Sequence, residues 1–425
     1  MKDSRREVRI VIKNEIKLFF SRKNILFFIA AAVSILLIYV FQYEKAYEKY
    51  PEEQIKSLES RWGDLEYLET LYSNRVEQLE EYDPEYERLE PIKQTAGILV
   101  SLRALCGLQI DCWEDWEKNE DMLRDLQKQE DRKLVEAPDK IEPGEETIFN
   151  WDRRDWRQRM LLHEAYEKAG IPEPVHKAVP TGAYVLYHGL EGTGVVFLVL
   201  ALLMLGWNYD IWSADFDEST SKLLYTLPFS RKRIFSVRCL VHWGLSLLGI
   251  VALLGILFLC GSVRFGFGWE DFQVINMQVW KHFSLFSMET AEMGAGDAVV
   301  SMGTAVGLRL LLTVLFFTLF FAIIQFVSFA WKSSTSVLVT MMALVTGVVS
   351  TMIIPATYEW ETYYVELAGQ ETGLWEQLIP LFYFQNGDIL SGAMGIGAPW
   401  VLLVEILMSL GIFIGTEIWM KRSEL

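Results

Sequence analysis

Six long, nearly uncharged runs constrain the fold of this chain more than any other feature of its sequence. Each is long enough for a helix to cross a hydrocarbon layer of about 30 Å. In lipid, such a run satisfies its backbone hydrogen bonds only as a helix. The runs cover Ile25–Phe41, Gly192–Asn208, Cys239–Gly261, Thr304–Ala330, Thr335–Ile354 and Pro399–Trp419. The sequence therefore predicts an all-α polytopic membrane protein with six transmembrane helices.

The distribution of Lys and Arg between the loops sets the expected orientation. With a cytoplasmic N-terminus, the inner segments contain Lys2, Arg5, Arg6, Arg9, Lys13, Lys17, Arg22, Lys23, Lys222, Arg231, Lys232, Arg233, Arg238, Lys332, Lys421 and Arg422. The shorter outer loops contain only Arg264 and Lys281, and no Lys or Arg occurs from Ser333 to Met420. Both termini are therefore expected in the cytoplasm.

The segment between the first two runs, residues 43–181, is expected to fold outside the membrane. Of the 56 acidic residues, 34 lie between Tyr43 and Gly182, with 20 of the 39 basic ones. Apolar residues three or four apart predict a helix over 55–79, and further helices are expected over 95–106, 113–134 and 151–169. The result is an acidic, helical, extracytoplasmic domain. A pI near 4.9 offers no broad basic surface, so nucleic acid is not an expected partner.

The search for catalytic and metal-binding motifs finds none that is complete. His163-Glu164 begins like a zinc-protease helix, but the position of the second histidine is Glu167. No phosphate-binding loop or nucleophile motif occurs, so no catalytic residue, metal site or cofactor is expected in this chain. Cys106 and Cys112 lie in the segment expected outside, where a turn at Gly107 allows a disulfide. Two reduced, buried thiols are the alternative.

Two segments expected in the cytoplasm stand out. Residues 1–24 contain a basic amphipathic helix, Glu7–Phe20, suited to the headgroup region of the membrane. Residues 209–238 form the loop between the second and third spans. This loop is expected to begin with a short helix, which Pro228 ends, and the basic cluster Arg231–Arg233 follows. The alternatives are a plain anchoring flank for the first segment and a solvated connection for the second.

The residues of this loop resemble a motif of a known family, the permease subunits of ABC-2 type (type V) exporters. The family pattern is an acidic residue, Thr or Ser, a leucine pair, Thr-Leu-Pro, a hydrophobic residue, Ser-Arg and a basic residue before the next span. Here it is matched by Glu218, Thr220, Leu223, Leu224, Thr226, Leu227, Pro228, Phe229, Ser230, Arg231 and Arg238. Residues Glu15–Ile29 are similar to the family's N-terminal connecting helix. Leu378–Phe382, in the outer loop 355–398, is similar to its short re-entrant helices.

This resemblance implies a permease in a bacterial cytoplasmic membrane that pairs with a second permease copy and two ATP-binding subunits. ATP and Mg would be bound by those partner subunits and not by this chain. The loop then acts as the coupling helix, through Asp217, Glu218, Thr220, Leu223, Leu224, Thr226, Leu227, Pro228, Ser230 and Arg231. The expected cargo is a peptide, drug or lipid-like amphipathic substrate.

The long outer segment departs from the family pattern, in which the first outer loop is often short. An acidic, Trp-rich domain suits a cationic amphipathic peptide. It suits equally a role in assembly or cell-wall contact. The alternative for the whole chain is a membrane scaffold or receptor that transports nothing and whose outer domain recognises a ligand or a cell-wall component.

Two charged residues lie inside predicted spans at similar depth from the outer side. Arg309 is in the fourth span and Glu405 in the sixth. Because charges within a membrane tend to find partners, the two are expected to pair. The alternative is that Arg309 extends to the outer interface.

Overall fold

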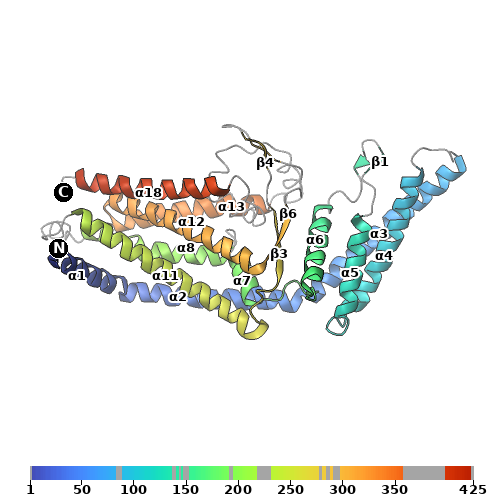
Figure 1. Cartoon of the computed structure of the whole chain (residues 1–425), viewed down its shortest axis with the longest axis horizontal. Coiled ribbons are helices and arrows are strands. Elements are labelled where there is room, and N and C mark those ends of the chain that lie inside the picture. The colour runs from blue at the N-terminus through green and yellow to red at the C-terminus, as the bar shows by residue number, and fades with distance from the viewer. Residues whose placement is uncertain are drawn as a thin grey trace.

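A computed structural model describes residues 2–82, 89–135, 140–142, 145–146, 153–190, 195–217, 231–276, 280–283, 288–290, 297–357 and 398–422. These residues are mostly helical. One end of the molecule is a bundle of long helices, and the other end is a separate group of helices from the acidic segment (Figure 1). The coupling residues 218–230 and the expected re-entrant segment Leu378–Phe382 lie outside the described residues.

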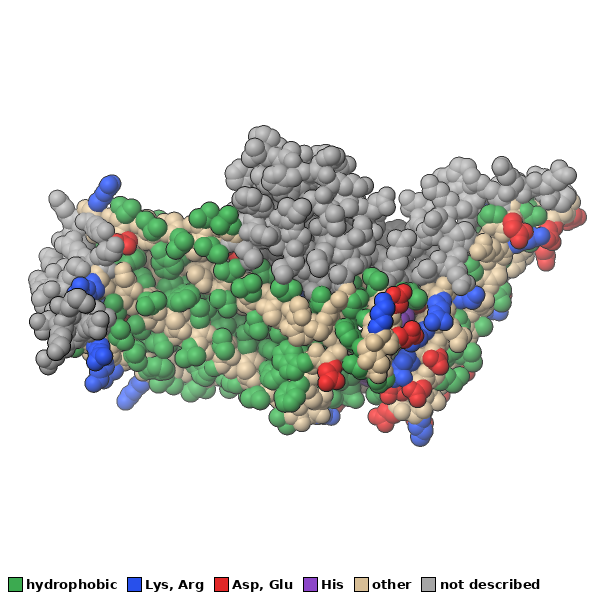
Figure 2. Space-filling view, in the orientation of Figure 1, with side chains coloured by type: hydrophobic (Ala, Val, Ile, Leu, Met, Phe, Trp, Pro, Cys, Tyr) green, Lys and Arg blue, Asp and Glu red, His purple; other side chains and the backbone are tan. Residues whose placement is uncertain are grey.

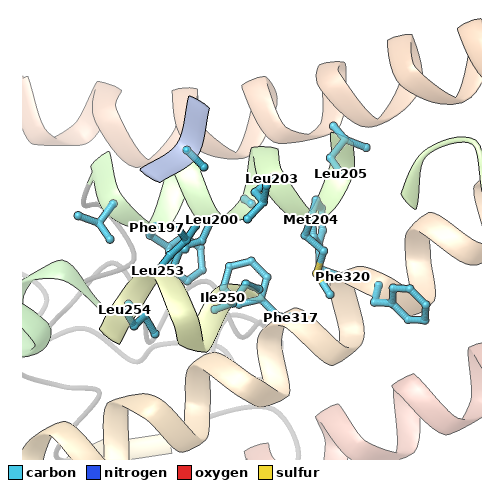
Figure 3. Close-up of a cluster of buried hydrophobic side chains, with 14 of the residues drawn as sticks. Phe197, Leu200, Leu203, Met204, Leu205, Ile250, Leu253, Leu254, Phe317 and Phe320 are labelled. Atoms are coloured by element: carbon cyan, nitrogen blue, oxygen red, sulfur yellow. The ribbon is translucent and has the colours of Figure 1, made fainter. Parts of the chain in front are cut away.

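The bundle contains a helix for each of the six predicted spans. In chain order these helices are α2 (Arg22–Ile38), α8 (Val195–Asn208), α11 (Arg231–Phe265), α12 (Met302–Trp331), α13 (Ser334–Thr357) and α18 (Ala398–Arg422). Side chains of α8, α11 and α12 meet in a buried apolar cluster (Figure 3). Phe197, Leu200, Leu253 and Phe317 are among its members.

Among the described residues, five helices are long and apolar enough to cross a membrane, and they are Arg22–Glu81, Leu89–Trp113, Val195–Asp215, Arg233–Phe265 and Met302–Trp331. A shorter apolar helix covers Ser334–Thr346. Four of the five contain predicted spans. The fifth, Leu89–Trp113, belongs to the segment expected outside, and its apolar residues are used in the core of that segment.

The surface of the bundle is apolar where it faces away from other helices. Figure 2 shows hydrophobic side chains covering this face, with charged side chains gathered at one end of the bundle and over the acidic helices. On α11 alone, the exposed fractions are 64% for Leu240, 62% for Leu248 and 57% for Leu259. A continuous apolar patch of this extent is unusual on a protein surrounded by water. The fold is therefore that of a helical protein suited to a membrane.

The acidic segment has its own hydrophobic core, formed by side chains of its first three helices and by Val175. The described part of this segment contains four helices. They are α3 (Lys45–Tyr82), α4 (Leu89–Trp113), α5 (Glu120–Val135) and α6 (Arg153–Ala169). Leu58, Leu99, Trp113 and Leu123 are buried in a cluster distinct from that of the bundle. The predicted helices 55–79 and 95–106 lie within α3 and α4, which are longer than expected. The predicted helix 113–134 is interrupted, because α4 ends at Trp113 and α5 begins at Glu120, and the predicted helix 151–169 corresponds to α6. We refer to these four helices and to residues 171–181, which follow them, as the outer domain, after the side of the membrane on which the sequence predicts them.

A single unbroken helix links the two parts of the molecule. α2 passes through a π-helical segment, η1 (Tyr39–Glu44), directly into α3, and the helix is continuous from Arg22 to Glu81. Pro51 lies in the second turn of α3 and does not interrupt it. The sequence predicts a first span that ends at Phe41 and a separate helix that begins at Ile55, so it does not indicate this continuity.

The mostly helical structure is compatible with the expected all-α class, and the described residues also include a few short strands. Two short strands, β3 (Phe272–Asn276) and β6 (Asp297–Ser301), pair antiparallel with Phe272 opposite Ser301. Ser301 then caps α12, because its hydroxyl accepts a hydrogen bond from the Thr304 amide. The other strands are β1 (Lys140–Glu142), β2 (Glu145–Glu146), β4 (Trp280–Phe283) and β5 (Met288–Thr290), and they form two small hairpins.

Close packing fixes the C-terminal end of α11 against the segment that precedes α7 (Gly182–Gly189). A Cβ added at Gly261 would lie 2.6 Å from the backbone carbonyl oxygen of Pro180. Real Cβ atoms do not approach a backbone oxygen so closely, so glycine is required here. A Cβ added at Gly255, on the same helix, would meet no other atom within 4 Å.

The N-terminal helix α1 (Lys2–Phe19) packs against α11 with an unexpected face. Its buried side chains are Glu15 and Phe19, whose exposed fractions are 5% and 3%. The predicted apolar face is partly turned outward, since Ile16 and Phe20 remain 37% and 57% exposed. This arrangement suits a helix that covers the end of the bundle while its apolar side chains reach lipid. The two chain ends lie at this same end, away from the outer domain (Figure 1).

Candidate functional site

The candidate site lies where the chain leaves α8 and approaches the predicted coupling residues. Four turn residues, 209–212, lead from α8 into α9 (Ser213–Asp217). The backbone amides of Trp212 and Ser213 donate to the Ser328 hydroxyl of α12, at 3.0 and 3.2 Å. The Trp212 indole, 1% exposed, donates to the side chain of Gln325. These contacts fix the start of the coupling loop on α12.

Arg238, in the first turns of α11, connects three elements at this point. Its Nε donates to Glu15 Oε1 of α1 at 3.1 Å, and one terminal nitrogen donates to the Ile211 carbonyl at 3.1 Å and to Asp215 of α9. The guanidinium carbon lies 4.8 Å from the centre of the Trp212 ring. Arg238 is only 5% exposed. One buried cation therefore joins α1, the start of the coupling loop and α11.

The contacts of Glu15 extend this network to α8. His242 Nε2 lies 3.6 Å from Glu15 Oε2, and His242 Nδ1 lies 3.3 Å from the Asn208 side-chain oxygen. Asn208 in turn donates to the Ser246 hydroxyl at 2.8 Å. Burial alone would raise the pKa of Glu15, but its contacts with His242 and Arg238 outweigh that effect and lower the pKa. The carboxylate is thus kept ionised as the partner of Arg238. We call Glu15, Asp215, Arg238 and His242 the buried junction.

The contacts of the buried junction fix the positions of helices. Its members form a closed set of ion pairs and hydrogen bonds, and none is a nucleophile beside a free base. A charge pair in a low-dielectric setting tolerates little displacement, because separating the partners leaves a buried charge without compensation. The junction therefore makes the positions of α1, α9 and α11 depend on one another.

The structure describes the two ends of the predicted coupling helix and not its middle. Asp217 is the last residue of α9, and Arg231 is the first residue of α11. The remaining members, Glu218, Thr220, Leu223, Leu224, Thr226, Leu227, Pro228 and Ser230, lie outside the described residues. The role of these residues stays a prediction.

Arg309 and Glu405 lie on neighbouring helices, α12 and α18, and each is 2% exposed. Arg309 donates to the carbonyl oxygen of Tyr187 in α7, and its guanidinium carbon lies 3.4 Å from the centre of the Tyr187 ring. Glu405 Oε2 has no hydrogen-bond partner among the described residues. Their pairing stays a prediction, and Arg309 is buried at this point of the bundle.

Cys106 and Cys112 are both free and buried. No turn forms at Gly107, because α4 continues to Trp113 and contains both cysteines. Six residues along one helix separate two Cα atoms by about 9 Å, which is beyond the reach of a disulfide. The Cys106 thiol instead donates to the Leu58 carbonyl of α3 at 3.2 Å. The structure has the alternative arrangement of two reduced thiols.

The sequence reading missed three members of the buried junction as site residues, namely Glu15, Asp215 and His242. One pattern in the sequence points to part of it, since Arg238 and His242 are four residues apart and share a helix face. Two long polar side chains on one face beside an apolar run indicate buried partners. Nothing local pairs them with Glu15, more than 200 residues earlier in the chain.

The chain has no significant match to any known family model or to any curated protein sequence. In the part of the chain that the structure describes, no group of three or more His, Cys, Asp or Glu side chains is arranged to hold a metal ion. The functional conclusion therefore depends on the junction, the apolar helices and the sequence resemblance.

Proposed function

We propose that this chain is the membrane-spanning permease subunit of an ABC exporter in a bacterial cytoplasmic membrane. In this proposal six helices cross the membrane, both termini are cytoplasmic and the outer domain lies on the far side. The chain pairs with a second permease copy and with two ATP-binding subunits, which bind ATP and Mg. The resemblance of the 211–238 segment to the family motif supports this assignment, as do the apolar helices and the position of both chain ends at one end of the bundle.

The observation that carries the proposal is the set of contacts made by Arg238. A coupling helix transmits a displacement only if the residues at its start are held against the helices that must move with it. Asp215 and Ile211, just before the coupling residues, are bound by Arg238, which also binds Glu15 of α1. A displacement of the loop is thereby passed to α1 and α11 together.

The first test is affinity purification of the tagged chain in a mild detergent, with identification of the proteins that co-elute. We expect an ATP-binding subunit, and only background ATP hydrolysis by the chain alone. Glu218→Lys and Leu224→Asp should reduce recovery of that subunit and uncouple its ATP turnover from transport. Lys421→Glu, a charge reversal at the other end of the chain, serves as the control. Normal recovery and coupling in both loop variants would contradict the proposal.

One observation favours the second candidate function, a membrane receptor or scaffold. The outer domain has a hydrophobic core of its own, separate from that of the bundle. A domain with its own core can recognise a ligand without transport by the bundle. Co-purification without any ATP-binding subunit, under conditions that retain other partners, would favour this reading.

A further inference from the structure

A polar cavity of about 290 Å³ lies inside the outer domain. Helices α3, α4, α5 and α6 form its walls, together with Lys177 from the segment after α6. The side chains of Arg61 and Arg159 are each 33% exposed, whereas Glu130 and Asp131 are 8% and 4% exposed. The carboxylates therefore lie deep in the cavity, and the two arginines remain accessible to solvent.

Each carboxylate oxygen of Glu130 and Asp131 in this cavity already has a partner in the protein. Glu130 accepts from Arg61 through one oxygen and from Gln109 through the other. Asp131 accepts from Arg159 at 2.9 Å through Oδ1, and its Oδ2 lies 3.0 Å from His163 Nε2. All four oxygens are engaged. A cationic ligand would compete with these partners and with the positive charge of the two arginines.

The donors, in contrast, are in excess. Arg61 forms an ion pair through one nitrogen only, and a guanidinium carries five N–H groups. Arg159 directs two of its three nitrogens to Asp131. Within the described residues, Lys177 has neither a hydrogen bond nor an ion pair from its ammonium group, and the same holds for the side chains of Gln54 and Gln127, which also line the cavity. The cations that line the cavity therefore retain N–H groups that no acceptor among the described residues uses, beside two neutral amide side chains.

This local excess opposes the charge of the surrounding segment. Acidic residues outnumber basic ones by 34 to 20 between Tyr43 and Gly182, yet three fixed cations face two carboxylates in the cavity. Arg61, Arg159 and Lys177 are accessible to solvent, so an anion that enters the cavity replaces water at their N–H groups and forms charge-assisted hydrogen bonds with them. The volume lies near the lower end of the range for small-molecule sites.

We propose that this cavity is a binding site for a small ligand with a phosphate or carboxylate group. The anionic group is held by the free N–H groups of Arg61 and Arg159 and by the Lys177 ammonium, and the rest of the ligand contacts Gln54 and Gln127. The site does not depend on the proposed transport function, because it lies in the outer domain and shares no residue with the buried junction.

The test is isothermal titration calorimetry on the full-length chain in detergent. The probes are inorganic phosphate and succinate, which distinguish the two anionic groups, with glucose as a neutral compound of comparable size. We expect saturable binding of at least one anion and none of glucose. Lys177→Gln should weaken that binding about tenfold, because one charged hydrogen bond is lost. Gln54→Ala should weaken it less, and neither change touches an ion pair of the protein.

Lys118→Gln is the matched control, since it removes the same charge from an exposed position of the same domain. Its binding constant should equal that of the unaltered chain. Circular dichroism verifies that each variant is folded. The proposal is overturned if neither anion binds saturably to the folded chain, if glucose binds as well as they do, or if Lys118→Gln and Lys177→Gln weaken binding equally.

Discussion

Removal of the Arg238 guanidinium is the most direct test of the buried junction. Arg238→Leu leaves the Glu15 carboxylate buried, with the His242 imidazole at 3.6 Å as its remaining polar neighbour. The side chains of Glu15 and Arg238 are only 7% and 6% exposed, so solvent compensates little for the loss. Breaking a buried ion pair by removing one partner costs about 3–5 kcal/mol. We expect a value near 3 kcal/mol, because His242 stays close to the carboxylate.

Lys23→Gln provides the matched comparison at the same end of the bundle. Lys23 pairs with Asp210 at 2.6 Å, but the two side chains are 36% and 28% exposed. A pair this accessible contributes about 0–1 kcal/mol. The free energy of unfolding of both variants can be measured in mixed micelles by titration with a denaturing detergent.

The double variant Glu15→Leu/Arg238→Leu sharpens the test. It removes both charges from the pair, so it should be less destabilised than Arg238→Leu alone. Two results would refute the reasoning. One is a loss in Arg238→Leu no larger than that in Lys23→Gln. The other is a double variant whose loss equals the sum of the two single losses.

Three other predictions follow from the structure. Burial would lower the pKa of His163, but hydrogen bonds and charges from two carboxylates outweigh burial and raise the pKa above 6.5. The stabilisation from this histidine is therefore complete below pH 6.5 and is lost as the pH rises through the raised pKa. The unfolding temperature should fall over this pH range, and His163→Gln should remove that dependence. Gly261→Ala should lower the unfolding temperature, whereas Gly255→Ala on the same helix should preserve or raise it. If Arg309 and Glu405 interact, Arg309→Leu and Glu405→Leu should give non-additive losses of thermal stability in detergent, and strict additivity would exclude the pair.

The helices of the bundle could be predicted from the sequence because lipid leaves an apolar run no alternative. A backbone without water must bond to itself, so the length of each run is enough to locate its helix. The helix ends of the outer domain were harder to predict, because tertiary packing and capping determine where each helix ends. At Gly107 the sequence permits a turn, but α4 continues because Cys106 and Trp113 are both buried against neighbouring helices.

The buried junction shows more clearly what could not be predicted from the sequence. Arg238 belongs to the family-like motif and was noted for its position before a span. Its partner Glu15 lies on a helix whose apolar residues predict a position in the headgroup region of the membrane and give no indication that this carboxylate is buried. Such a pairing depends on how α1 crosses α11, and the crossing is set by contacts distributed over both helices. The strand pair β3–β6 was missed for a similar reason, since its two strands are 20 residues apart and show no strong alternation.

The unbroken helix from Arg22 to Glu81 has a mechanical consequence. Its outer part, the 38 residues of α3, is about 57 Å long at 1.5 Å per residue. A tilt of about 10° where α3 begins displaces its far end by about 10 Å, from the same geometry. The π-helical turn at Tyr39–Glu44 lies just before this pivot. The helix is thus a lever that enlarges a small rotation in the bundle into a displacement comparable to the diameter of a helix at the tip of the outer domain.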